Sequence, residues 1–308
     1  MTRADRVQVL PEVAEALATR QPVVALESTI ISHGLPRPDN LRVARDIEQT
    51  VRDAGAVPAT VAVVAGRVQI GLDDDALTAV ASRDDVVKVS PRDLAMVAAK
   101  DGYGATTVAS TAHLAALVGI SVFATGGLGG VHRGAGTTYD ESADLSTLAR
   151  VATTVVCAGV KSILDVPATL ERLESYGVAL MGYRTDRFPG FYLTDSGYAL
   201  EHRVDTPEDV AAVMVAREDL ATTGTALVVA NPVPPDQQLD PGLHDRVLLE
   251  SLAAAERDGI HGKEVTPYLL ARFHRETEGA SLQVNTTIVL RNADLAARIA
   301  VARAALGR

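Results

Sequence analysis

The chain has 308 residues, 47% of them hydrophobic, and a formal net charge of −10. The acidic balance argues against non-specific binding to nucleic acid, which requires a basic surface, but a small anionic ligand needs only local basic groups. The single cysteine, Cys157, excludes an internal disulfide and a metal site built from several cysteines.

Short apolar runs alternate with segments of helical spacing along the chain. Strands are predicted at 23–26, 58–65, 67–70, 86–89, 121–124, 152–157, 178–182 and 225–229. Helices are predicted at 40–54, 74–81, 94–99, 107–118, 168–176, 207–216, 244–257, 267–277 and about 282–305. This alternation predicts an α/β fold with a parallel or mixed sheet and helices on both faces.

We find neither a linker nor a targeting signal. The Pro-rich stretch at 231–235 directly follows a predicted strand, so we interpret it as a loop and expect one domain over residues 1–308. Residues 1–5 lack the pattern of a signal peptide, and no apolar run reaches the roughly 18 residues that cross a membrane. We therefore expect a cytoplasmic protein.

Three segments place a polar residue at or near the end of a predicted strand, namely Glu27, Lys88 and Lys161. In open α/β sheets, ligands bind at the edge formed by the carboxyl ends of the strands. Each residue also has an ordinary explanation. Glu27 could pair with an arginine or cap a turn, Lys88 could point to solvent from an edge strand, and Lys161 could be a surface lysine.

A lysine inside a pocket has a specific chemical use. Burial disfavours its charged form, and the free amine can attack a sugar carbonyl to form a Schiff base. Lys161 is our first candidate for this role, because it follows an apolar run and a small-residue turn. If Lys88 faces the same pocket, each lysine disfavours the charge of the other, so that one can attack while the other holds an anion.

The segment 125–136 contains six glycines in twelve residues. Such a loop lets backbone N–H groups approach a ligand closely and bind an anion, and His132 and Arg133 could add positive charge. It matches neither the dinucleotide fingerprint nor the phosphate-binding P-loop. The alternative is a flexible loop without a ligand.

Acidic and hydroxyl groups surround this loop in the sequence. Asp140, Glu141 and Asp144 suit a hard divalent cation such as Mg²⁺ or Mn²⁺, although Ser142 or Asp144 could simply cap the next helix. Residues 106–111 open a predicted helix with hydroxyl and free N–H groups, which could bind the polar edge of a ligand or only cap the helix. Cys157 is expected in the core.

Seven blocks, in the same order over nearly the whole chain, resemble the pseudouridine-5′-phosphate glycosidase family, also called pseudouridylate synthases or indigoidine synthase A-like proteins. They are residues 25–36, 104–111, 125–135, 142–145, 157–165, 230–232 and 262–267. The resemblance implies reversible cleavage of pseudouridine 5′-phosphate to uracil and ribose 5-phosphate. It also implies a three-layer α/β/α sandwich around a mixed, largely parallel sheet, a homotrimer, and a lyase of the carbon–oxygen class (a hydro-lyase in the synthetic direction).

The resemblance assigns roles to particular residues. Lys161 would form the Schiff base with ribose C1′, and Glu27 would donate a proton. Asp140 would bind one Mn²⁺ per subunit. Substrate would be bound by a further set, namely Lys88, Val108, Ser142, Ala143 and Asp144. Family members often have a second basic residue shortly after the lysine that corresponds to Lys88. This chain has Pro91 there, before Arg92, which would reduce the positive charge near the phosphate.

The chemistry explains why such residues are needed. The leaving atom is uracil C5, a carbon without a lone pair, so an iminium at Lys161 must accept electrons while C5 takes a proton from Glu27. That acid must keep its proton near neutral pH, so desolvation should raise the pKa of Glu27. Backbone amides at Thr107 and Val108, together with Asn285, could read the uracil edge, although Asn285 could equally cap a helix.

Two other functions share some of these features. Another Schiff-base lyase acting on a phosphosugar, such as an aldolase, would use the same lysine and acid. A phosphosugar-binding protein without catalysis would keep the glycine-rich loop but would not need both Glu27 and Lys161.

Overall fold

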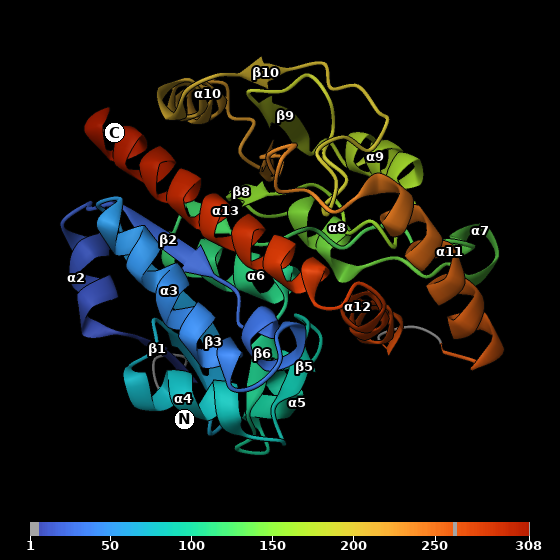
Figure 1. Ribbon diagram of the computed structural model, residues 1–308. Coiled ribbons are helices and arrows are strands. Elements are labelled where there is room, and N and C mark those ends of the chain that lie inside the picture. Colours follow the sequence, from blue (N-terminus) through green and yellow to red (C-terminus); the bar gives the residue numbers. More distant parts are fainter. Residues whose placement is uncertain (1–5, 261–263, 308) are drawn as a thin grey trace.

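The computed structural model describes residues 6–260 and 264–307 (Figure 1). Residues 1–5, in which we looked for a targeting signal, lie outside this part, as do Gly262 and Lys263 of the block 262–267. Among the described helices, none is both long and apolar enough to cross a membrane.

The strands form an eleven-stranded sheet in the order β1-β4-β3-β2-β7-β8-β11-β9-β10, with β6 also pairing with β3, and β5 with β6. Their bounds are β1 Val7–Val9, β2 Val23–Leu26, β3 Val57–Val64, β4 Arg67–Ile70, β5 Val87–Val89, β6 Gly104–Thr106, β7 Val122–Ala124, β8 Thr154–Cys157, β9 Ala179–Tyr183, β10 Arg203–Val204 and β11 Leu227–Ala230. β3 is antiparallel to β4 and β6, and the other pairings are parallel. The prediction of a mixed, largely parallel sheet is confirmed.

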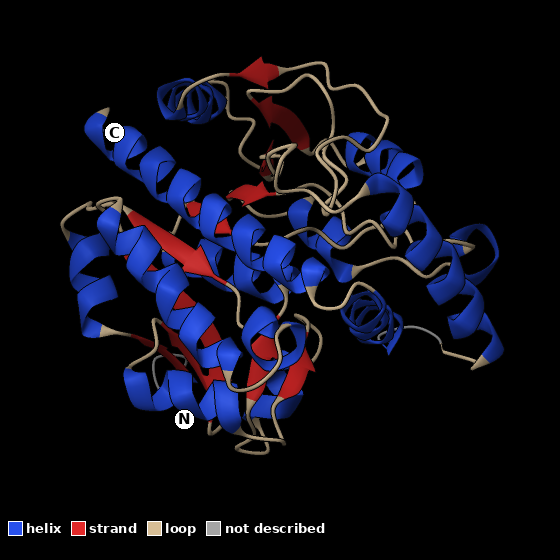
Figure 2. Ribbon diagram, viewed as in Figure 1, coloured by secondary structure: helices blue, strands red, loops and turns tan. Residues whose placement is uncertain are grey.

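Helices connect the strands and cover the sheet (Figure 2). Their bounds are α2 Pro11–Ala18, the π-helix η1 Ile30–Gly34, α3 Asp39–Asp53, α4 Asp74–Ser82, α5 Leu94–Ala98, α6 Val108–Val118, α7 Ala135–Thr138, α8 Ala143–Leu148, α9 Val166–Ser175, α10 Pro207–Asp219, α11 Pro241–Arg257, α12 Val265–Glu276 and α13 Ala280–Ala305. The predicted helices are all present, with ends shifted by a few residues.

Side-chain alternation along the central strands builds the layers, because successive residues of a strand point to opposite faces. In β2, Val23 and Ala25 belong to the buried cluster that includes residues of α2 and α6, whereas Val24 and Leu26 belong to the cluster that includes residues of α3, α10 and α13. In Figure 1, α3 and the long α13 cross one face of the sheet, with α6 and α8 behind it. Both faces are therefore covered, which confirms the α/β/α arrangement.

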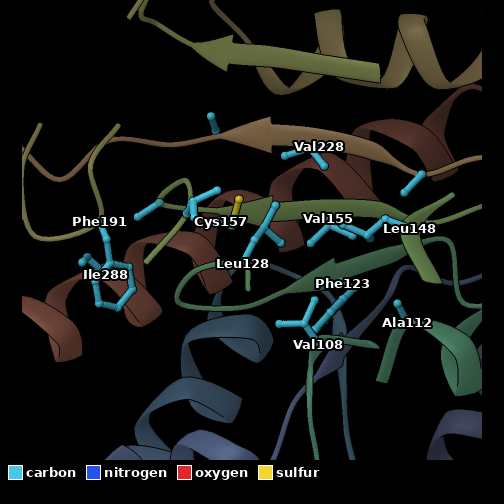
Figure 3. Packing of buried hydrophobic residues seen from close by; sticks show 14 of the residues in the cluster. Val108, Ala112, Phe123, Leu128, Leu148, Val155, Cys157, Phe191, Val228 and Ile288 are labelled. Carbon is cyan, nitrogen blue, oxygen red and sulfur yellow. The ribbon is translucent and has the colours of Figure 1, made fainter. Parts of the chain in front are cut away.

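The hydrophobic core extends to the glycine-rich segment 125–136 and to the loop that carries Phe191. Phe123 and Val155, from neighbouring strands, lie in one buried cluster with Leu128 of the glycine-rich segment, and Phe191 lies beside Ile288 in the same cluster (Figure 3). Cys157 lies fully buried in β8, and burial raises the pKa of its thiol to about 12. The prediction that this cysteine is a core residue is confirmed, and the core gives the loops a rigid base.

Several short elements have no range among the predicted ones, namely β1, α2, η1, β6, α7, α8 and β10. Strands of two or three residues carry too few side chains to show a period of two, which explains β1, β6 and β10. The π-helix η1 follows soon after β2 and lies within the block 25–36. That block shows a resemblance to the family but no periodicity that predicts a helix.

Candidate active site

A cavity of about 470 Å³, here called the front chamber, lies at the carboxyl edge of the parallel strands. Glu27 follows β2 and Lys161 follows β8, two strands separated only by β7. Lys88 reaches the same chamber from β5. The structure therefore brings together the three residues that the strand-end pattern singled out.

Glu27 is set deep in protein beside the lysines. Desolvation raises the pKa of its carboxyl group, and the positive charge of Lys161 and a hydrogen bond from Thr125 oppose that effect. Among the described residues no arginine pairs with Glu27, so the ion-pair explanation for this residue is wrong. A carboxyl group in this setting tends to keep its proton to a higher pH than an exposed glutamate.

Lys88 points into the chamber and not to solvent, so the edge-strand explanation is wrong for it. Burial lowers the pKa of Lys88, the positive charge of Lys161 lowers it further, and Asp144 and Glu27 act in the opposite direction. The two lysines thus share one chamber, which is the condition that the sequence left open. Lys161 lies on the loop after β8, where its N–H donates to the carbonyl of Leu128 at 3.1 Å.

Asp144 joins the glycine-rich loop to the start of α6. Its two carboxylate oxygens accept hydrogen bonds from the N–H of Ala109 at 2.9 Å and the N–H of Gly129 at 2.7 Å. A side chain at position 129 would collide with Ser142 and Asp144, which explains the glycine. Ser142, not Asp144, caps α8, by accepting the N–H of Asp144 at 3.2 Å.

The N-terminus of α6 opens into the front chamber. Thr107 caps this helix through its hydroxyl group, which accepts from the N–H of Ser110. Since Ala109 is bonded to Asp144, the N–H of Val108 is left without a hydrogen-bond partner among the described residues. Thr107 and Val108 both line the chamber.

The mouth of the chamber carries His132 and Asp140. His132 Nδ1 lies 3.9 Å from Asp140 Oδ2, and both side chains are partly buried. Arg133, which could have added charge, is exposed and does not line the chamber. Glu141 pairs with Arg172 at 2.5 Å. Asp140 and Glu141 both line the chamber, and among the described residues Asp140 pairs only with His132, not with an arginine or a lysine.

The described residues contain no group of three His, Cys, Asp or Glu side chains placed to hold a metal ion. One carboxylate, that of Asp140, fits a hard cation that keeps most of its water, as Mg²⁺ does and as Mn²⁺ can. The donor set therefore suits a hydrated, weakly held ion and not an enclosed metal centre.

Behind the chamber lies a narrow second cavity of about 50 Å³, here called the neck. Glu27, Lys88 and Lys161 border both spaces. The neck is further lined by Phe191 and by Asn285, whose Oδ1 is buried without a hydrogen-bond partner. Asn285 lies inside α13, so the suggestion that it caps a helix is wrong.

Sequence reasoning missed Thr125 and Phe191. Thr125 follows β7 directly, so its strand-end position could have indicated a role beside Glu27. Phe191 is buried with a φ of +63°, a left-handed backbone conformation that is uncommon outside glycine. No sequence pattern that we used indicates such a conformation.

An α/β fold with an acid and two lysines around a polar chamber at the carboxyl edge of a parallel sheet defines a small-molecule site typical of enzymes. The chain belongs to the indigoidine synthase A-like protein family, whose model matches residues 12–302. This confirms the family that the seven sequence blocks indicated.

Two curated relatives carry the same name, pseudouridine-5′-phosphate glycosidase. The one from Salinispora tropica is 67% identical over 294 residues, which cover 96% of this chain and 91% of the relative. The one from Streptomyces griseus is 61% identical over 293 residues, which cover 95% and 91%.

Two solved structures resemble the fold closely. The crystal structure of the prealnumycin C-glycosynthase AlnA with ribulose 5-phosphate matches with a TM-score of 0.90 and 35% identity, covering 98% of both chains. An indigoidine synthase A-like protein from Thermotoga maritima matches with a TM-score of 0.87 and 33% identity, covering 98% of this chain and 97% of the other.

Proposed function

We propose that this protein is an enzyme that reversibly cleaves the carbon–carbon glycosidic bond of pseudouridine 5′-phosphate, giving uracil and ribose 5-phosphate. The observation that carries the proposal is that Lys161 and Glu27 border the same narrow neck, next to a polar chamber with room for a sugar phosphate. The names of the curated relatives support the substrate. The ligand of the prealnumycin C-glycosynthase supports a five-carbon sugar phosphate.

The proposed mechanism begins with an opened ribose. The amine of Lys161 bonds to C1′ as the bond from C1′ to the ring oxygen breaks, and a proton from that amine passes to the oxygen, which becomes a hydroxyl group. The nitrogen lone pair then forms an iminium while Glu27 protonates C5, and the electrons of the C1′–C5 bond return to the uracil ring. Water hydrolyses the iminium, which releases ribose 5-phosphate, restores the lysine amine and returns a proton to Glu27.

The surroundings of both groups suit these steps. Glu27 must hold a proton until C5 accepts it, and the raised pKa of its buried carboxyl group favours the protonated acid. Lys88 lines the same chamber as Lys161, and burial together with the positive charge of Lys161 lowers the pKa of Lys88. We assign the covalent bond to Lys161 and anion binding to Lys88 from the resemblance of the sequence blocks to the family, to which the chain belongs.

We assign the phosphate to the front chamber. Lys88 and His132 line it, and the free N–H of Val108 at the start of α6 adds the anion-binding end of a helix. Ser142 and Ala143 line the same wall and would contact the sugar phosphate. Asp144 acts differently in this assignment, since both its oxygens are bonded to backbone N–H groups and so hold the chamber's walls together.

We assign the uracil ring to the neck. Phe191 offers an apolar face, and the unpartnered Oδ1 of Asn285 would accept an N–H of the base. Thr107 and Val108 line the front chamber but not the neck. We therefore move these two residues from the uracil edge to the sugar phosphate.

Asp140 would hold one hydrated Mn²⁺ at the chamber mouth. When bound there, the ion would supply positive charge to offset the phosphate. His132 lies beside Asp140 and would be held by it at the phosphate end of the chamber.

The alternatives differ in what they require. A phosphosugar-binding protein has no need of a buried acid and a lysine around one neck. An aldolase would use the same lysine, but the relatives' names favour a nucleotide substrate over a free phosphosugar. The test is incubation with pseudouridine 5′-phosphate and Mn²⁺, with uracil measured by chromatography. Wild-type protein should release uracil and Lys161→Ala should not, while a binding protein would release none in either form.

We also propose that the protein is a homotrimer and acts in the cytoplasm in the breakdown of pseudouridine. Its proposed class is that of the carbon–oxygen lyases, named for the synthetic direction of the reaction. The support is the resemblance of the seven sequence blocks together with the membership of the family. Sedimentation equilibrium should give about three times the chain mass of 32.3 kDa. A monomeric or dimeric mass at assay concentration would contradict the trimer.

A further inference from the structure

A third cavity, of about 230 Å³ and here called the rear cavity, lies between η1, α12 and the start of α13. It shares lining residues with the neck, namely His33, Gly34, Pro267, Leu270 and Asn285. The neck in turn shares Glu27 and Lys161 with the front chamber. The three spaces thus follow one another, with the reacting groups between the first and the second.

The rear cavity faces solvent at its far side. Four residues on its rim are exposed, namely His33, Pro36, Ala271 and His274. Its inner wall is apolar at Leu35 and Leu282. The neck therefore shares lining residues with two larger spaces, the front chamber, which Lys161 lines, and the rear cavity, which Lys161 does not line.

The two outer spaces differ in chemistry. The front chamber is lined by the cationic side chains of Lys88, Lys161 and Arg92. Among the described residues, neither a lysine nor an arginine lines the rear cavity. The polar groups of the rear cavity are hydroxyl and amide groups together with two histidines. Burial raises the pKa of the Tyr192 phenol, which forms a side-chain hydrogen bond with Ser281, so this hydroxyl group stays uncharged.

Asn285 stands where the neck and the rear cavity meet. Its Oδ1 is buried with no partner, and the residue is only 7% exposed. A buried acceptor without a donor is costly, so an N–H group from a ligand is expected there. Apolar walls, neutral polar groups and one free acceptor suit a flat, uncharged cyclic amide and do not suit a phosphate.

We infer that the rear cavity is a separate passage for the nucleobase, which enters and leaves there while the sugar phosphate uses the front chamber. The inference rests on the proposed function. If the front chamber were the sole route, ribose 5-phosphate bound to Lys161 would stand between the neck and solvent and would trap the base behind it. With a rear passage, uracil can leave and return while the sugar phosphate stays bound.

Isotope exchange tests this order of events. The enzyme is incubated with pseudouridine 5′-phosphate, labelled uracil and Mn²⁺, and label entering the nucleotide is compared with net release of ribose 5-phosphate. A rear passage predicts exchange faster than net release by roughly tenfold or more, since departure of one product does not wait for the other. Exchange no faster than net release would overturn the inference.

Two substitutions narrow the passage from different helices, Ala271→Trp on α12 and Leu282→Trp on α13. Both positions line the rear cavity but not the neck or the front chamber. The matched control is Ala253→Trp on the exposed face of α11, which lines none of the three spaces. Exchange should fall by roughly tenfold in the first two variants and stay unchanged in the control.

Trapping with borohydride and ribose 5-phosphate alone separates the possible results. This reaction uses only the front chamber, so both passage variants should form the adduct at the wild-type rate. Normal trapping with slowed exchange supports the rear passage, and normal trapping with unchanged exchange in both variants overturns it. If wild-type protein neither traps ribose 5-phosphate nor releases uracil, the proposed function itself fails, which is a distinct outcome.

Discussion

The hydroxyl group of Thr125 donates a hydrogen bond to Oε1 of Glu27, and it does so from the residue that directly follows β7. Thr125 is itself held by α13, because its carbonyl accepts from Nδ2 of Asn292 at 2.7 Å. The Oδ1 of Asn292 accepts in turn from Asn231 at 2.9 Å. A buried chain of amide groups thus fixes the donor that orients the acid.

Replacing Thr125 by valine should move the pH dependence of activity. The hydrogen bond from Thr125 lowers the pKa of Glu27 against the larger effect of burial, so its loss lets the pKa rise further. Because the acid is active when protonated, the alkaline limb of kcat/KM for uracil release should shift to higher pH. Thr125→Ser keeps the hydroxyl group and should retain the wild-type limb. A limb that stays in place in Thr125→Val would show that Thr125 does not tune the acid.

Glu27→Gln should change stability with pH in a defined direction. Burial raises the folded-state pKa of Glu27 above its ordinary value of 4.5. A group with a raised folded-state pKa contributes stability below its unfolded pKa, and that contribution is lost as pH rises through the folded pKa. Glutamine does not titrate, so the variant does not lose this contribution. The difference in Tm between the variant and the wild type should therefore increase in favour of the variant from pH 5 to pH 8, and calorimetry at both pH values measures it. A difference that moves in favour of the wild type as pH rises would contradict the raised pKa.

The sequence indicated this edge of the sheet because a polar residue stands at or near the end of each of three strands. Glu27, Lys88 and Lys161 could be found in this way, and the parallel sheet brings their strand ends together. Phe191 and the partner of Glu27 could not, since a left-handed backbone and a side-chain hydrogen bond depend on tertiary contacts. The two hydrogen bonds of Asp144 could not be predicted for the same reason, because its partners, Ala109 and Gly129, lie outside α8, 35 and 15 residues away in sequence.

Asp144→Asn should destabilise the fold. Both carboxylate oxygens accept from backbone N–H groups, whereas an asparagine has one acceptor and would turn an NH₂ group toward the second donor. Leaving a buried donor unsatisfied costs about 1–3 kcal/mol, which urea unfolding can measure. Asp165→Asn is the matched control, since Asp165 accepts one N–H as the cap of α9 and asparagine caps helices equally well. Equal stability of the two variants would contradict the tie between the loop and α6.

Binding of Mn²⁺ should depend on Asp140 and not on its neighbour. Electron paramagnetic resonance of free Mn²⁺ in a titration measures the bound fraction without any assay of activity. Asp140→Asn should weaken binding by about tenfold or more, because a ligating carboxylate is lost. Glu141→Gln should bind Mn²⁺ as the wild type does, since Glu141 is paired with Arg172. The assignment fails if Glu141→Gln loses Mn²⁺ while Asp140→Asn keeps it.

The most direct test of the account asks which lysine forms the covalent bond. Protein incubated with ribose 5-phosphate and Mn²⁺ is reduced with borohydride, digested and mapped by mass spectrometry. The account predicts a ribose-phosphate adduct on Lys161, with Lys88 unmodified in the same sample. An adduct on Lys88, or none on either lysine while a control imine is reduced, would contradict the central claim.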